Sequence, residues 1–388
     1  MEQLKNKAQV DLRDIPSIIG GDKKSRHGVV LAKSIPAKKY GIRTGEPVVN
    51  ALRKCPGLVV EPPDHSMYRE KSKKLMEYLR GFTTKIEQVS VDECYMDFSE
   101  IAHRYPSPLD AAFFIKNGIR ERFGFTVNIG ISENKLLAKM ASDFDKPDKV
   151  HTLFVKEVAE KMWPLPVGEL FMAGKSSVDV LKKLEIHTIG DLANADLALV
   201  ELHLKSHGKM LWEFANGIDR SSVHWEQAEA KGIGNSTTLA EDAATYEEAK
   251  AVFAELAESV GKRLRKAGQK ACMVSMEIKY HDFQSISHQM QLTKPTCEER
   301  VLYDSACRLF LEAWSGEPVR LLGIRTAKLV DAAEPEQLSI FDIEPPKPKD
   351  EKHERLNAAM KKIKKKYGDS AVMKASSMQK RKKPEGDS

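Results

Sequence analysis

The sequence predicts an α+β protein built from several domains, and three observations lead to this prediction. A chain of 388 residues is long for a single domain. Its hydrophobic content of 41% is sufficient to fill compact cores. Patterns typical of strands and of helices are interleaved over residues 1–155 and 234–330, whereas residues 163–225 are predicted to be helical with short turns.

The first part of the chain alternates between strands and helices. Apolar runs at 18–21 and 28–32 flank a basic loop and predict a pair of strands. Thr44 is placed to cap a helix that opens near Pro47, and residues 68–79 predict a further helix.

Residues 234–330 contain the most regular pattern. A strand is followed by a helix whose apolar residues recur at three- and four-residue spacing, then by two strands of strict alternation, a second helix and a last strand. The order β-α-β-β-α-β predicts a ferredoxin-like arrangement, in which two helices cover one side of a four-stranded sheet. These residues are therefore expected to form a separate domain.

Positive charge is concentrated at the C-terminus. The chain has 62 basic and 56 acidic residues, a formal charge of +6. Residues 345–388 contain 14 of the basic and 6 of the acidic residues, so this tail carries +8 and the rest of the chain −2. Lysine-rich tails are solvated and bind polyanions such as nucleic acids. The pattern over 355–376 leaves open whether the tail contains an amphipathic helix or is disordered.

Composition also excludes several classes of protein. No apolar run approaches the roughly eighteen residues that a membrane span needs, and the N-terminus lacks the apolar core of a signal peptide. The five cysteines are scattered and form no CxxC pair, which argues against a disulfide framework and against a zinc site. We expect a cytoplasmic, monomeric protein with no membrane partner.

The sharpest local signal is the adjacent pair Asp92-Glu93, which lies between two β-rich runs in KIEQVSVDECYMDFS. Asp-Glu is a poor choice for a tight hairpin turn, because such turns favour residues that accept positive φ. Adjacent carboxylates repel each other unless a cation lies between them, and Mg²⁺ prefers carboxylate oxygens. From spacing alone, the pair is either a magnesium site or two exposed surface acids.

Three lysines follow this pair in the sequence. A predicted strand over 125–131 leads into a helix that carries Lys135 and Lys139 one turn apart, and Lys146 follows just past the end of that helix. Lysines beside a carboxylate–metal pair suit a triphosphate, whose charge requires both metal and ammonium partners. Taken alone, Lys135 and Lys139 are more typical of a solvated helix face.

Five segments between Val10 and Val330 resemble, in order, successive signatures of the Y-family, lesion-bypass DNA polymerases of the DNA polymerase IV and UmuC type. The segments are SVDECYMDFSE, GISENKLLAKMASDFDKP, VGELFMAGKSSVDVLKKLEIHTIGDLA, IGNSTTL and PVRLLGI. The resemblance implies a template-directed DNA polymerase for translesion synthesis in DNA repair, with primed DNA and deoxynucleoside triphosphates as substrates and two Mg²⁺ ions as cofactors. It also implies a palm and fingers (1–155), a thumb with a helix-hairpin-helix (156–230), a little finger (231–331), a linker with a clamp-binding motif (332–350) and a basic tail (351–388).

The resemblance assigns the catalytic metal ions to Asp92 and Glu93. It assigns the triphosphate to Lys38, in the segment SIPAKKYG, and to Lys146. Lys38 stands where the family has an arginine, and Ile35 stands where the commoner pattern has a tyrosine hydroxyl. We therefore expect the nucleotide to be held more weakly or in a different arrangement.

The resemblance also assigns contacts with the DNA backbone. Gly174 and Lys175 lie at a predicted helix start, where exposed backbone N–H groups favour a phosphate. The alternative is an ordinary turn between helices. In the little finger, the assigned residues are Lys231, Gly232, Gly234 and Asn235.

The pentapeptide QLSIF is a lone apolar cluster among the acidic residues and prolines of the linker. Such a cluster is a liability unless a partner buries it. It resembles the bacterial sliding-clamp-binding pentapeptide, Gln-Leu-x-Leu-Phe, so a bacterial sliding clamp is the expected partner. The alternative is that the segment docks on its own domain. The five residues are Gln337, Leu338, Ser339, Ile340 and Phe341.

One family feature does not appear in the sequence. The family begins with a strand that carries a first catalytic aspartate, followed by an aromatic residue that excludes ribonucleotides, whereas MEQLKNKAQV resembles the helix after that strand. Asp11 and Asp14 do not fit the motif. Two interpretations follow: a lesion-bypass polymerase, or a catalytically impaired or inactive protein that binds DNA and the sliding clamp.

Overall fold

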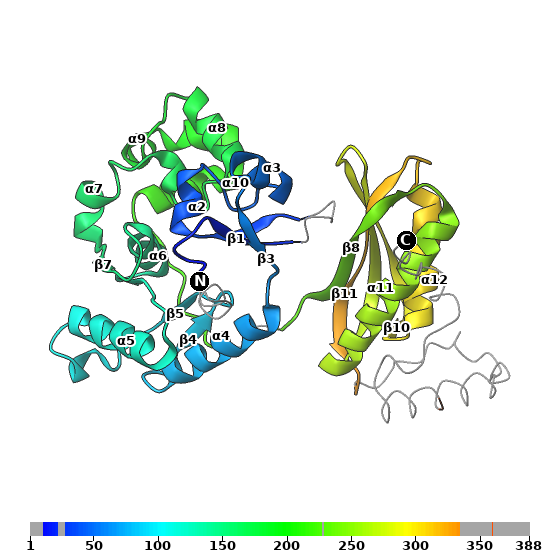
Figure 1. The fold of residues 1–388 in the computed structure, drawn as a ribbon, viewed down its shortest axis with the longest axis horizontal. Coiled ribbons are helices and arrows are strands. Elements are labelled where there is room, and N and C mark those ends of the chain that lie inside the picture. Colours follow the sequence, from blue (N-terminus) through cyan, green and yellow to red (C-terminus); the bar gives the residue numbers. More distant parts are fainter. Residues whose placement is uncertain (1–10, 22–27, 227–228, 334–358, 360–388) are drawn as a thin grey trace. The chain divides into compact units, whose positions relative to one another are not determined.

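The computed structural model describes residues 11–21, 28–226, 229–333 and 359. The chain divides into two compact units, Met1–Ala228 and Glu229–Ser388 (Figure 1). Within the described ranges, no helix is both long enough and apolar enough to cross a lipid bilayer.

The first unit opens with a three-stranded sheet in the order β2-β1-β3. β1 is antiparallel to β2 and parallel to β3, and all four of its residues are buried. The predicted pair of strands is therefore confirmed. The bounds of the strands are β1 (Ser17–Gly20), β2 (Val30–Lys33) and β3 (Val59–Glu61).

Two short helices, α2 (Ile35–Lys39) and α3 (Val48–Lys54), pack on this sheet. The buried Ser34 hydroxyl caps α2, because it accepts a hydrogen bond from the Ala37 amide at 3.1 Å. The prediction that Thr44 caps α3 is wrong. Pro47 occupies the cap position, and the preceding turn is closed by the Glu46 carboxylate, which accepts from the Arg43 amide at 2.9 Å.

A second group of elements shares its own core. It consists of α4 (His65–Arg80), the hairpin of β4 (Ile86–Gln88) and β5 (Cys94–Met96), and α5 (Pro108–Phe123). Helix α4 begins three residues before the predicted start, because the Asp64 side chain accepts from the Met67 amide at 3.0 Å and caps the helix there.

The parallel strands β6 (Ile129–Ile131) and β7 (Val150–Thr152) flank helix α6 (Lys135–Asp143) in the chain. The predicted helix is confirmed, whereas only the last three residues of the strand predicted over 125–131 are in a strand. Helix α6 lies very close to β6, since a Cβ atom added to Gly130 would lie 1.9 Å from the Ala138 carbonyl oxygen.

The rest of the first unit is helical, as predicted. Its core is continuous with α6, because Leu137 and Met140 pack in the same buried cluster as Leu181, Leu192 and Leu211. The helices are α7 (Val158–Lys161), α8 (Lys175–Lys183), α9 (Ile189–Asn194) and α10 (Leu197–Ala215), and short 3-10 turns lie at 102–104, 155–157 and 167–169.

The second unit has the element order β-α-β-β-α-β, as predicted. Its sheet has the order β10-β9-β11-β8 with antiparallel neighbours, so β11 lies between β8 and β9 and both β-α-β connections are split. Both helices share one buried core with a single face of the strands (Figure 1). The elements are β8 (Gly232–Ala243), α11 (Tyr246–Ala267), β9 (Gln269–Tyr280), β10 (Ser285–Thr296), α12 (Glu299–Ala313) and β11 (Val319–Asp331).

Candidate active site

Asp92 and Glu93 lie in the turn between β4 and β5, as the sequence predicts. The Val89 and Ser90 amides both donate to the Glu93 carbonyl, at 3.0 and 3.2 Å. The Ser90 hydroxyl accepts from the Asp92 and Glu93 amides at 3.3 and 3.1 Å, and it donates to the Asp92 carboxylate at 2.7 Å. Ser90 thus organises a turn without glycine and leaves both acidic side chains exposed.

Helix α6 places Lys139 beside this turn, and Lys146 follows the end of the helix. Lys139 Nζ lies 2.6 Å from Glu93 Oε1 and 3.2 Å from Asp143 Oδ2. Lys146 Nζ lies 2.5 Å from the other oxygen of Asp143. Charges of alternating sign therefore run from Glu93 through Lys139 and Asp143 to Lys146, and we call these four residues the ion network.

Within the ion network, the contacts of Asp143 and Lys139 favour the charged form of both residues. Burial by itself would raise the pKa of Asp143, but the hydrogen bonds from Lys146 and Lys139 outweigh burial and hold this pKa below its usual value. Burial would also lower the pKa of Lys139, yet its bonds to Glu93 and Asp143 raise that pKa above the usual value.

Lys135 points to a different carboxylate. Its Nζ atom lies 2.9 Å from Glu87 Oε2 and 5.5 Å from the ring centroid of Tyr95. Only 14% of the Lys135 side chain and 20% of the Lys139 side chain are exposed, so these residues do not form a solvated helix face. Glu87 also accepts from the His224 amide at 2.8 Å, which ties the segment after α10 to strand β4.

Sequence reasoning missed Glu87 and Asp143 as members of this site. Asp143 follows Lys139 by four residues on a helix, and this spacing is a signal that could have identified the pair. Glu87 lies 48 residues before Lys135, and no local pattern predicts a contact over that distance.

The donor atoms at the turn fit a magnesium ion that is shared with a substrate. Among the described residues, no group of three or more His, Cys, Asp or Glu side chains is placed to hold a metal ion. Asp92 and Glu93 nevertheless present two exposed carboxylates next to each other. Mg²⁺ usually keeps several water molecules and binds through one or two carboxylates together with substrate phosphates.

Lys38 is exposed on α2. In the described part of the chain, no hydrogen bond or ion pair connects it to the ion network. Its predicted position near the triphosphate is therefore supported by sequence alone.

The start of α8 is accessible to a ligand. Gly174 and Lys175 are exposed, and a Cβ atom added to Gly174 would meet no atom within 4 Å. Helices α8 and α9 are joined by a short turn, and the Thr188 hydroxyl caps α9 by accepting from the Asp191 amide at 3.0 Å. This is the helix-hairpin-helix arrangement that the sequence predicts.

In the second unit, the two glycines of β8 have a structural explanation. A Cβ atom added to Gly232 would lie 2.3 Å from the Thr326 carbonyl oxygen, and one added to Gly234 would lie 3.0 Å from the Ile324 carbonyl oxygen. Both glycines therefore allow β11 to pair closely with β8. Lys231 is exposed just before this edge strand, and the Asn235 amide group donates to the Ser259 hydroxyl at 3.2 Å. The predicted clamp-binding residues 337–341 lie outside the described residues, and so does the basic tail except for residue 359.

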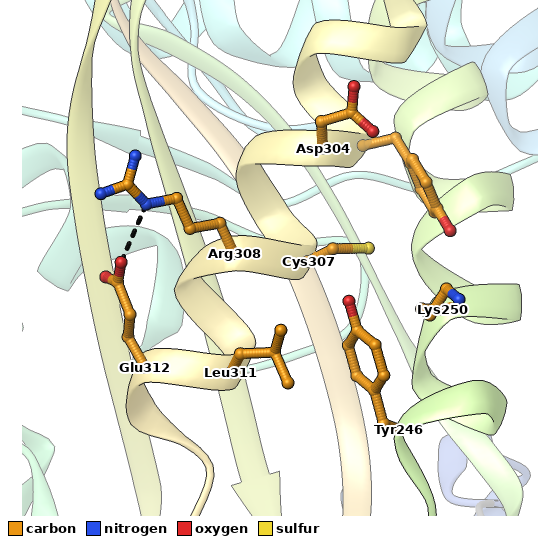
Figure 2. A pocket seen from close by; sticks show the side chains of 8 residues that line it. Tyr246, Lys250, Asp304, Cys307, Arg308, Leu311 and Glu312 are labelled. Atoms are coloured by element: carbon orange, nitrogen blue, oxygen red, sulfur yellow. Dashed lines mark hydrogen bonds and ion pairs between the residues drawn. The ribbon is translucent and has the colours of Figure 1, made fainter.

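A groove of about 470 Å³ lies between α11 and α12. Figure 2 shows the Cys307 thiol and the Tyr246 hydroxyl in the space between the two helices. Burial raises the pKa of Tyr303 to about 12 and also raises the pKa of Cys307. Neither a phenolate nor a thiolate is therefore available at neutral pH, and the groove lacks an activated nucleophile.

Comparisons with known proteins show matches over both units. Residues 1–143 match the impB/mucB/samB family, and residues 230–340 match the C-terminal domain of that family. The DNA polymerase IV of Clostridium acetobutylicum is 45% identical over 383 residues, which cover 99% of this chain and 95% of that protein. DNA polymerase IV 1 of Bacillus subtilis is 37% identical over 95% of this chain and 88% of its own length.

A solved structure shows the same fold. The Y-family DNA polymerase chimera of Dbh and Dpo4 superposes with a TM-score of 0.72 at 21% identity, over 85% of this chain and 94% of the chimera. The α+β multidomain fold class is thereby confirmed. On the strength of the family matches and the relatives, the chain belongs to the Y-family of lesion-bypass DNA polymerases, of the DNA polymerase IV type.

Proposed function

We propose that this chain synthesises DNA past damaged template bases and that the reaction takes place at the Asp92-Glu93 turn. The observation that supports this assignment best is the ion network, which joins the turn to α6 and to Lys146. Acidic ligands for a metal and ammonium groups for a triphosphate are thus held together by residues from three parts of the chain. Nucleotidyl transfer needs this combination of charges.

Each residue of the site has a separate proposed role. Asp92 and Glu93 would hold magnesium, two ions by family, and the metal would supply charge neutralisation at the triphosphate and activation of the primer hydroxyl. The Lys146 side chain is 60% exposed, so its ammonium group can transfer from Asp143 to the phosphates of a nucleotide. Lys139 keeps Asp143 ionised and holds the Glu93 carboxylate in place. Lys38 supplies a second ammonium group from α2.

DNA is bound through its phosphates in this proposal. The palm and fingers (1–155) hold the reacting ends, while the thumb (156–230) and the little finger (231–331) hold the duplex. The exposed start of α8, at Gly174 and Lys175, provides backbone N–H groups and a positive charge. β8 lies at the edge of its sheet, so Lys231 and those amides of residues 232–235 that do not point toward β11 are the corresponding contacts.

We also propose that residues 337–341 bind a bacterial sliding clamp and that the protein acts as a monomer in the cytoplasm. The apolar pattern of QLSIF supports the first of these proposals. The double variant Leu338→Ala, Phe341→Ala should lose the clamp in a pull-down and should still bind bare primed DNA. A double variant that retains the clamp would refute the motif.

The interpretation of the chain as an inactive DNA- and clamp-binding protein is not supported by the comparisons. The relatives that match nearly the whole chain are named as DNA polymerases. Primer extension with Mg²⁺ on an undamaged template and on one with an abasic site tests the two interpretations directly. We expect extension past the lesion by the chain and none by Asp92→Asn, while the exposed control Glu121→Gln keeps full activity. Failure of the unmodified chain on both templates would contradict the proposal.

A further inference from the structure

We infer that an ion pair between Lys116 and Asp148 positions Lys146 for the incoming triphosphate. Lys116 lies in α5 and Asp148 lies two residues after Lys146. The inference rests on the proposed function, because that proposal assigns Lys146 to the triphosphate.

Lys116 occupies an unusual place for a lysine. It lies on the buried face of α5 together with Ala112, Ile115 and Ile119, and only 5% of the residue is exposed. Burying an ammonium group is costly unless the group is paired and hydrogen-bonded. Lys116 Nζ donates to Asp148 Oδ1 at 2.8 Å, so the carboxylate of Asp148 satisfies this requirement.

Asp148 is held by two cations from successive turns of the same helix. Its second oxygen accepts from Arg120 at 3.1 Å. The hydrogen bond from Lys116 is the main cause that holds the pKa of Asp148 below its usual value, so the carboxylate is ionised at neutral pH. Asp148 also has φ of 62°, which is a left-handed backbone conformation. This conformation is costly for residues other than glycine, and the contacts of the Asp148 side chain help to stabilise it.

Asn128 fixes the same segment through its backbone groups. Its amide nitrogen donates to the carbonyl oxygens of Ser142 and Asp145, at 3.1 and 2.7 Å. Its amide oxygen accepts from the Lys149 amide at 3.1 Å. All three hydrogen bonds hold backbone groups that precede or follow Lys146.

Lys146 is therefore an exposed lysine whose backbone is fixed both before and after it in the chain. The Lys146 side chain is 60% exposed and reaches Asp143 in the ion network. A fixed backbone reduces the number of positions that the ammonium group samples, and this lowers the entropy lost when it binds a phosphate. Lys116 is therefore a positioning residue, which acts on the substrate through Lys146.

The variant Lys116→Met removes the charge and keeps an unbranched side chain of similar length. We expect KM for the incoming nucleotide to rise about five- to tenfold, because the ammonium group of Lys146 is less well placed. kcat should change by less than about twofold, because Lys146 is proposed to bind the triphosphate and not to take part in the chemical step. Affinity for primed DNA should be unchanged, because Lys146 is not proposed to contact DNA. Lys116→Arg keeps the charge and should restore most of the nucleotide affinity.

A double-mutant cycle with Lys146→Ala distinguishes positioning from a general loss of structure. If Lys116 acts through Lys146, then Lys116→Met has no further effect on KM in the Lys146→Ala background. An equal rise in KM in both backgrounds would overturn the inference. If Lys146→Ala alone leaves KM unchanged, the proposed role of Lys146 fails as well. If Lys146→Ala raises KM and Lys116→Met does not, only the inference fails.

Two further variants control for folding. Arg265→Met removes an ion pair with Glu299 in the second unit and should leave the nucleotide KM unchanged. If Lys116→Met does not fold, Asp148→Asn is the alternative. It removes the charge of the more exposed partner of the same ion pair and should give the same rise in KM. Thermal unfolding of each variant identifies a temperature at which all of them are folded.

Discussion

Ser90 and Lys139 explain how two adjacent acids are held in one short turn. The Ser90 hydroxyl donates to Asp92 at 2.7 Å, while the Lys139 ammonium group contacts Glu93 at 2.6 Å. Each carboxylate thus has a different partner, which offsets part of their mutual repulsion. A carboxylate has about four acceptor sites, so these contacts leave capacity for a cation.

The ion network also predicts how stability depends on pH. The folded-state pKa of Asp143 lies below its value in the unfolded chain, so the contribution of Asp143 is present above about pH 4 and is lost as the pH falls through the lowered pKa. Denaturant unfolding should therefore give a steady free energy of unfolding from pH 7 to 5 and a decline below about pH 4. Asp143→Asn should reduce that decline, and an unchanged decline would show that Asp143 does not contribute.

At the scale of elements, the contact between β6 and α6 determines where the lysines lie. A Cβ atom at Gly130 would lie 1.9 Å from the Ala138 carbonyl oxygen and 2.6 Å from the Ser142 amide nitrogen. Gly130→Ala must push α6 away from the sheet. We expect it to lower the free energy of unfolding by about 3 kcal/mol and to reduce primer extension, because α6 carries Lys139.

Gly57→Ala is the matched control for this substitution. A Cβ atom added there would meet no atom within 4 Å, and Gly57 does not have a left-handed φ. The free energy of unfolding should therefore stay within about 1 kcal/mol of the wild type. Equal effects of the two substitutions in denaturant unfolding would contradict the close packing of α6 on β6.

The sequence predicted the second unit better than the first. The strands of the second unit are 12 or 13 residues long, and most of one face of each is packed against the helices, so the two-residue alternation is visible. β4, β5 and β6 have three residues each, too few to show a period. The cap of α3 and the start of α4 were misplaced because capping at Pro47 and Asp64 depends on local geometry.

The same limit applies to the candidate site. Asp92-Glu93 and Lys146 could be assigned to the candidate site because each lies within a compact sequence motif, whereas Lys139 taken alone was more typical of a solvated helix face. The pair of Lys135 with Glu87 spans 48 residues and the pair of Lys116 with Asp148 spans 32. Such pairs arise only when separate helices and strands pack together, and one sequence contains no periodic signal for them.

At the scale of the whole molecule, each unit has its own core, and the proposed DNA contacts are distributed over both. If phosphate contacts dominate, log affinity for primed DNA should fall linearly with log salt concentration and should depend little on DNA sequence. Lys175→Ala should make this slope shallower by about one unit, because it removes one phosphate contact.

Lys182→Ala is the matched control for that measurement. Lys182 is exposed on the same helix, but it lies in the last turn of α8 rather than at its start. Its removal should leave the salt dependence unchanged. If Lys175→Ala and Lys182→Ala behave alike in a salt titration of DNA binding, the start of α8 is not the phosphate site.

The central claim is that nucleotidyl transfer takes place at the Asp92-Glu93 turn, and single-turnover incorporation of one nucleotide tests it most directly. The maximal rate is measured at saturating nucleotide and Mg²⁺ for the chain and for Glu93→Gln, with primed-DNA affinity measured in parallel. We expect the rate to fall by about a hundredfold or more while DNA affinity stays within about twofold, because the substitution removes charge stabilisation only at the reacting groups. A rate for Glu93→Gln equal to that of the unmodified chain would contradict the claim.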